Sequence, residues 1–136
     1  MTVLLDTHAL IWLAEGLEEL PARSRRLLDA AARTEGLAVS PITFWEVAML
    51  ESRRRVSLSH PVEQWREAVL APSQIQEAEL DGAIAIESVG LPGDFHEDPA
   101  DRILVATARL RGWKLATRDS RILDYGAAGY VDVLRV

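Results

Sequence analysis

The sequence predicts an α/β fold, a three-layer α/β/α sandwich around a short, mostly parallel central sheet. Short apolar runs alternate along the chain with longer stretches of helical periodicity, a pattern typical of parallel sheets that helices cover on both faces. The 136 residues match the size of one ordinary domain, and no linker, repeat or low-complexity stretch divides them. We therefore expect a single domain over residues 1–136.

The first predicted elements are a strand and two helices. Val3–Leu5 is wholly apolar and ends at Asp6, which indicates a short buried strand. Residues 7–14 carry apolar side chains at helical spacing, so a helix is expected directly after Asp6. Residues 21–33 predict a second helix, because their apolar side chains gather on one face.

Two further strands and three further helices follow. Leu37–Val39 is again short and apolar, and a Ser-Pro pair ends it. Residues 42–53 predict a helix for which Thr43 is the expected cap. Weaker patterns then predict, in order, a helix over residues 61–70, a strand over 73–76 and a helix over 79–87.

The clearest helix covers residues 98–111. Asp98 is a good N-cap, Pro99 suits the first helical position, and Gly112 suits the position after the last turn. Residues 113–116 and 131–136 complete the predicted sheet as two further strands.

The composition excludes several kinds of site. The chain has no cysteine, which rules out disulfides, thiolate zinc sites and cysteine nucleophiles. His8, His60 and His96 are far apart in the sequence and form no HxxxH pair, which argues against zinc. The N-terminal residues have neither a basic leader nor a long apolar run, so we expect no signal peptide, no membrane span and a cytoplasmic protein.

The charge distribution bears on nucleic-acid binding. A formal net charge of −6 argues against it, because phosphate binding favours basic surfaces. Clusters of arginine weaken that argument, although each is equally compatible with a solvated helix face. The clusters are Arg53 to Arg55, then Arg23, Arg25 and Arg26, and finally Arg109, Arg111, Arg118 and Arg121.

Acidic residues fall near the ends of the predicted strands, where ligands bind in open parallel sheets. Asp6 follows the first strand directly, and Asp119 lies just past the strand over residues 113–116. Asp98 and Asp101 open the helix before that strand, and Glu46 lies about one turn into the helix after the second strand. These side chains can converge on one crevice.

Converged carboxylates need a cation or protons. Two unit charges about 4 Å apart repel by roughly 4 kcal/mol at an effective dielectric constant near 20. Oxygen ligands select hard cations, so Mg²⁺ is expected, with Mn²⁺ as the alternative. A metal held by carboxylates can activate water and offset charge on a phosphate, so phosphodiester hydrolysis is the natural chemistry.

Each acid also has a structural interpretation. Asp98 is most simply a helix cap, Asp101 can compensate the helix dipole, and Asp119 can belong to a turn. Glu46 alone is unremarkable among many glutamates. Asp6 has the weakest structural explanation, because a carboxylate that ends a buried strand is costly unless it is used or well hydrogen-bonded.

Three segments resemble one known family. LLDTHALIWL, FWEVAML and HEDPADRILVATARLRGWKLATRD are similar to PIN-domain proteins, and more narrowly to the VapC toxins of type II toxin–antitoxin modules. The resemblance spans essentially the whole chain. It implies a PIN-like fold, a Mg²⁺-dependent endoribonuclease that hydrolyses RNA with metal-activated water, a homodimer and a cognate antitoxin.

The resemblance also implies residue roles. Asp6, Glu46, Asp101 and Asp119 take the four acidic positions of the family's site, with Asp6 and Asp101 as the principal Mg²⁺ ligands. Glu46 and Asp119 complete the pocket, through water or by positioning the nucleophile, and Asp119 also ranks as a metal ligand. Asp98 accompanies them as a weaker candidate ligand.

Two other functions stay open. A non-enzymatic binding module would use the same acids to grip a basic partner, which the net charge favours. A receiver domain or a haloacid-dehalogenase-like phosphatase also places an aspartate at a strand end. However, Lys114 is the only lysine, and His8 stands where the phosphatase needs a second aspartate.

Overall fold

A five-stranded parallel sheet forms the centre of the computed structural model, which describes residues 1–72 and 74–136. The strand order is β3-β2-β1-β4-β5, and every neighbouring pair is parallel. The strands are β1 (Val3–Leu5), β2 (Leu37–Val39), β3 (Ile75–Glu77), β4 (Lys114–Thr117) and β5 (Val133–Arg135).

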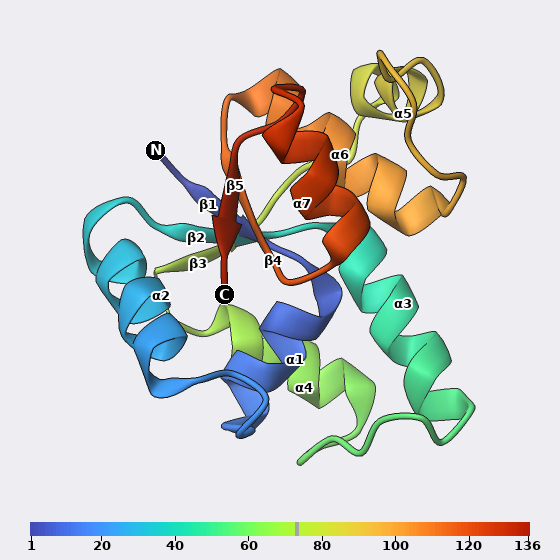
Figure 1. Cartoon of the computed structure of the whole chain (residues 1–136). Coiled ribbons are helices and arrows are strands. Elements are labelled where there is room, and N and C mark those ends of the chain that lie inside the picture. Colours follow the sequence, from blue (N-terminus) through green and yellow to red (C-terminus); the bar gives the residue numbers. More distant parts are fainter. Residues whose placement is uncertain (73) are drawn as a thin grey trace.

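Helices cover both faces of this sheet (Figure 1), which confirms the α/β/α class. They are α1 (Thr7–Glu15), α2 (Ala22–Thr34), α3 (Pro41–Ser52), α4 (Val62–Leu70), α5 (Gly82–Val89), α6 (Pro99–Arg111) and α7 (Ser120–Ala127). Helices α1, α2 and α4 lie on one face, α6 and α7 lie on the other, and α5 packs on α6. Within the described residues, no helix is long and apolar enough to cross a membrane.

The central strand β1 serves both layers. Its side chains alternate, so Val3 and Leu5 join the core formed with α1, α2 and α4, whereas Leu4 joins the core formed with α6 and α7. All three are almost fully buried. This explains why the strand is a continuous apolar run rather than an alternating one.

Strand β1 lies between β2, the next strand along the chain, and β4, which the chain reaches only after β3. The carboxyl ends of β1 and β4 therefore lie side by side at a topological switch point, where open α/β sheets bind ligands. Leu5 pairs with Ala116 in this register, which brings Asp6 and Thr117 to neighbouring positions at the edge.

Most predicted elements are confirmed with small shifts at their ends. Helix α5 begins at Gly82 rather than at residue 79, because Asp81 caps it by accepting from the Ile84 amide at 2.9 Å. Part of the predicted strand over residues 73–76 lies outside the described residues, since Ser73 is not described.

One expectation about a helix was wrong, and one helix was missed. The cap of α3 is Ser40, which accepts from the Ile42 amide at 3.2 Å, whereas Thr43 is buried within the helix. Helix α7 was not predicted at all. Its capping aspartate and its buried Ile122 and Tyr125, three residues apart, are the signals that could have indicated it.

The core of β4 yields a stability prediction. Leu115 has no exposed surface, so Leu115→Ala is expected to lower the free energy of unfolding by about 2–5 kcal/mol, as measured by urea denaturation. The matched control is Leu27→Ala on α2, where the side chain is 37% exposed and the loss should stay near or below about 1 kcal/mol. Equal losses in the two variants would contradict the layer arrangement.

Candidate active site

A pocket of about 410 Å³ lies at the carboxyl ends of β1 and β4. Its lining includes every acid that the strand-end argument selected: Asp6, Glu46, Asp98, Asp101 and Asp119. These residues come from both halves of the chain. Asp6 and Asp119 lie where a strand meets a helix, Glu46 lies within α3, and Asp98 and Asp101 lie at the start of α6. The structure thus brings the predicted acids together in one place.

Asp6 is the buried floor of the pocket, with only 9% of its surface exposed. Its Oδ1 accepts from the Ala9 amide at 2.8 Å and so caps α1, while its Oδ2 accepts from the Thr117 hydroxyl at 2.6 Å. Burial raises the pKa of Asp6, and these two hydrogen bonds oppose that rise. The carboxylate is therefore held in one orientation.

Thr117 joins the two strand ends across the switch point. Its hydroxyl donates to Asp6 and accepts from the Asp119 amide at 3.0 Å. Asp119 in turn caps α7, since its Oδ1 accepts from the amides of Arg121 at 2.9 Å and Ile122 at 3.2 Å. Thr117 is a positioning residue that the acid-based reading of the sequence missed.

Glu46 enters the pocket from α3, which runs between the two layers in contact with α1 and α6. The hydroxyl of Thr7, in the first turn of α1, donates to Glu46 Oε1. Thr7 also lies 3.5 Å from the Thr43 hydroxyl, both of them buried. The threonine after Asp6 thus fixes a carboxylate that lies 39 positions away.

Helix α6 supplies Asp98 and Asp101. Asp98 caps the helix by accepting from the Asp101 amide at 3.0 Å, and Pro99 follows at the first helical position, as predicted. Asp101 stands one turn further along, with its carboxylate 3.1 Å from His96 Nε2 and 3.8 Å from an Arg121 nitrogen. The cap thereby places Asp101 at the mouth of the pocket.

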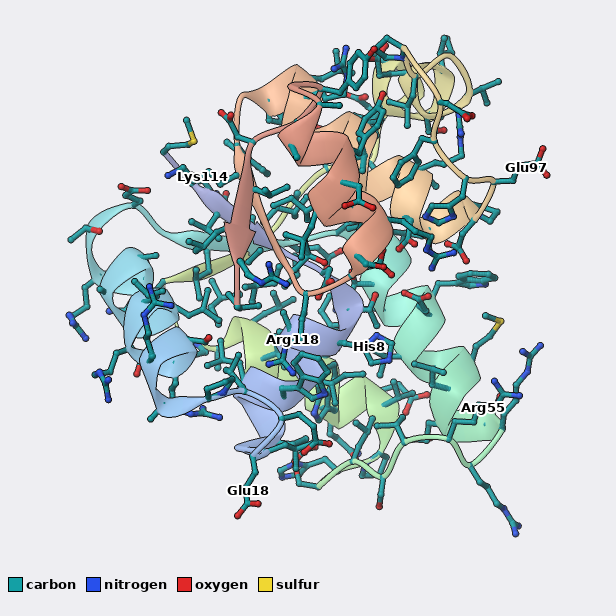
Figure 2. The ribbon with its side chains drawn as sticks, viewed as in Figure 1. His8, Glu18, Arg55, Glu97, Lys114 and Arg118 are labelled. Carbon is teal, nitrogen blue, oxygen red and sulfur yellow. The ribbon has the colours of Figure 1, made fainter. Side chains whose placement is uncertain are left out.

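Basic and aromatic side chains complete the rim. His8, Trp12, Arg118 and Arg121 line the same pocket. The Arg118 guanidinium lies 4.5 Å from the Trp12 ring centroid and donates to backbone carbonyls of Val136 and Glu19. Figure 2 shows His8 and Arg118 close together, far from Lys114 at the opposite end of β4.

The three histidines are far apart in the sequence, and this spacing did not indicate that one of them lies beside the acids. One ligand atom each from His96, Asp101 and Asp119 lies within 4.8 Å of the other two. His8 lines the acidic pocket from α1, whereas His96 lines a second hollow with Phe95 and Tyr125. His60 contacts Ser59 outside both. The HEDPADR segment, which carries two of the predicted acids, is the signal that could have indicated His96.

The electrostatics of the pocket show uncompensated negative charge. Burial, followed by the charges of Asp98, Asp119 and Glu46, raises the pKa of Asp101 to about 7. Burial by itself would raise the pKa of Asp119 as well. The hydrogen bonds that Asp119 accepts from the Arg121 side chain and the Ile122 amide hold its pKa below the ordinary value. Such an oxygen-rich pocket can bind a hard cation or retain a proton.

Comparisons with known proteins agree with this geometry. Residues 3–128 match the model of the PIN domain. The chain is 33% identical over 124 residues to Ribonuclease VapC22 of Mycobacterium tuberculosis (strain ATCC 25618 / H37Rv), covering 91% of this chain and 92% of that protein. PIN-domain ribonucleases are metal-dependent.

Solved structures share the fold. A toxin–antitoxin complex from Klebsiella pneumoniae matches with a TM-score of 0.66 and 28% identity over 97% of this chain and 95% of that one. VapBC2 from Rickettsia felis, bound to a promoter DNA fragment, matches with a TM-score of 0.70 and 15% identity over 99% and 98%. The chain therefore belongs to the PIN-domain family, and within it to the VapC-type ribonucleases.

Proposed function

We propose that this chain is a Mg²⁺-dependent endoribonuclease that acts as the toxin of a toxin–antitoxin pair. The observation that carries the proposal is the convergence of five carboxylates on one pocket at the switch point of the sheet. The similarity to a VapC ribonuclease and to toxin–antitoxin complexes supports the substrate class and the antitoxin partner. Because the proposed substrate is RNA, we also propose a cytoplasmic location.

The residues of the pocket fit a divalent metal ion. The donors are carboxylates. Burial, together with the charges of Asp98, Asp119 and Glu46, raises the pKa of Asp101, so a cation there would be favoured. We assign Asp101, Asp119 and Asp6 as ligands, with Asp98 as a weaker candidate. Carboxylate oxygens favour Mg²⁺, with Mn²⁺ as a substitute. The bound ion would supply positive charge to the phosphate and lower the pKa of the attacking water.

The protein's own groups orient the reaction. The Thr7 hydroxyl holds Oε1 of Glu46, which leaves Oε2 to accept a proton from the attacking water. Asp6 is held at both oxygens and therefore defines a fixed edge of the pocket. Arg121 reaches Asp119 at 3.2 Å from the exposed side and is free to turn toward a phosphate.

The RNA backbone needs basic surface outside the pocket. Arg53, Arg54 and Arg55 follow α3, the helix that carries Glu46, and all three are exposed. Figure 2 places Arg55 beyond the end of α3, away from the sheet. Within the described residues, none of the three pairs with a carboxylate. We assign these three arginines to RNA binding.

We also propose that the toxin acts as a homodimer, as the resemblance to the VapC toxins implies.

A non-catalytic binding module remains the alternative, because the net charge of −6 suits a basic partner. The two functions differ in one measurement. Titration calorimetry that detected neither Mg²⁺ nor Mn²⁺ binding to the free chain would favour the binding module.

Removal of a single pocket carboxylate tests the proposed activity. Asp6→Asn and Asp101→Asn keep the side-chain shape but remove a ligand charge, so each should slow cleavage of structured RNA by about 100-fold or more. Asp132→Asn, an exposed position outside the pocket, is the matched control and should cleave like the wild type. Undiminished cleavage by both pocket variants would refute the proposal.

The pKa of Asp101 gives a prediction for the metal-free protein. In the folded chain this carboxyl ionises near pH 7, whereas in the unfolded chain it ionises near 3.9. Raising the pH from 4 to 7 therefore favours the unfolded state. Asp101→Asn removes this penalty, so it should be more stable than the wild type at pH 8 by about 1–2 kcal/mol, allowing for solvent screening, and equally stable near pH 4.

Urea denaturation in the presence of EDTA at pH 4 and pH 8 measures this difference. A variant that was less stable than the wild type at pH 8 would show that the pocket tolerates the Asp101 charge without a cation.

Salt dependence tests the arginine cluster. Replacing Arg53, Arg54 and Arg55 together by Gln should weaken binding of single-stranded RNA and lower the slope of log K against log salt by up to about 2. The matched control replaces Arg23, Arg26 and Arg33 of α2, which are also exposed, and should leave the slope unchanged. An unchanged slope in the first variant would show that the cluster is a solvated helix end.

A further inference from the structure

We propose that His96 is a positioning residue of the metal site, which donates its Nε2–H to the Asp101 carboxylate and does not itself ligate the ion. This inference rests on the proposed function, because Asp101, the partner of His96, lines the acidic pocket. It goes beyond the acidic set, since it assigns one nitrogen atom a defined role.

The loop that carries His96 is held in place by Arg102, the arginine of the HEDPADR segment. Its guanidinium donates to four backbone carbonyls, those of Ser88 at 2.6 Å, Phe95 at 2.9 Å, His96 at 3.0 Å and Val89 at 3.1 Å. The Phe95 ring lies 4.4 Å from the His96 ring, centroid to centroid. The imidazole is therefore presented to α6 by a fixed backbone.

The hydrogen bonds at Nδ1 identify the tautomer. The Asp98 amide donates to His96 Nδ1 at 3.3 Å, and an Arg121 nitrogen lies 3.5 Å from the same atom. Both neighbours are donors only, so Nδ1 must act as the acceptor. In a neutral imidazole the other nitrogen then carries the proton. The lone pair that a metal would need at Nε2 is absent in this arrangement.

The surroundings of His96 Nε2 indicate that Asp101 is its hydrogen-bond partner. This atom is buried, and among the described residues it has no hydrogen bond of good geometry. Its nearest charged neighbour is Asp101 Oδ2, at 3.1 Å. A buried N–H without a partner costs about 1–3 kcal/mol. A turn of the Asp101 carboxylate satisfies it, and Asp119 lies close enough for both acids to share one ion.

Residues of one short segment therefore position one another. The Asp98 side chain fixes the backbone of Asp101, while the Asp98 amide fixes the ring of His96. The ring then fixes the carboxylate of Asp101. Outer-shell partners of this kind typically change metal affinity by about 10–100-fold when they are removed.

Electron spin echo modulation of bound Mn²⁺ distinguishes a positioning residue from a ligand. A directly bound imidazole gives nitrogen modulation of the Mn²⁺ signal. Because His96 is not expected to bind the ion, the nitrogen modulation of the wild type and of His96→Ala should be the same. Nitrogen modulation that disappears in His96→Ala would make His96 a ligand and overturn the inference.

Calorimetry with Mn²⁺ measures the positioning effect. His96→Ala should bind about tenfold more weakly than the wild type, and His96→Gln, which keeps an N–H donor at the end of the side chain, should recover most of the loss. His60→Ala, outside the pocket, is the matched control. Unchanged affinity in His96→Ala would defeat the inference alone, whereas absence of Mn²⁺ binding by the folded wild type would defeat the proposed function with it.

A measurement on the wild type alone protects the test against variants that fail to fold. Long-range ¹H–¹⁵N correlation spectra should show His96 protonated at Nε2, both before and after Mg²⁺ is added. Protonation at Nδ1 would contradict the inference.

Discussion

The mutual repulsion of carboxylates at one end of the sheet is the constraint on which the rest of the site depends. The fold lessens this repulsion by making three of the acids into helix caps. Asp6, Asp98 and Asp119 each accept backbone amides at the N-terminus of a helix, where the partial positive charge of the helix favours an anion. The same three aspartates therefore cap helices and line the pocket, so the two interpretations of these residues do not exclude each other.

Asp101 marks where this compensation ends. It stands in the first turn of α6 but accepts no amide of that helix among the described residues, and it faces three other acids. Its pKa near 7 follows from this position. A carboxyl whose pKa is raised in this way can exchange its proton for a cation. The cation would then stabilise the site, since it would offset the negative charge that the helix N-termini leave uncompensated.

The sequence predicted the sheet well, because its short apolar strands are buried on both faces and stand out as continuous runs. It predicted Asp6 for a physical reason, since a charge at the end of a buried strand needs a partner. It did not predict Glu46 on such grounds, because only the contact with Thr7 distinguishes this glutamate from others. Contacts between distant segments are invisible to periodicity, which is also why Thr117 and His96 were missed.

Anomalous diffraction from crystals that contain Mn²⁺ would show whether the acidic pocket is one metal site. A manganese peak is expected among the carboxylates of Asp6, Asp101 and Asp119, within about 2.0–2.6 Å of their oxygens. Well-ordered carboxylates with no manganese peak between them, at a pH above 7, would contradict the proposed metal site.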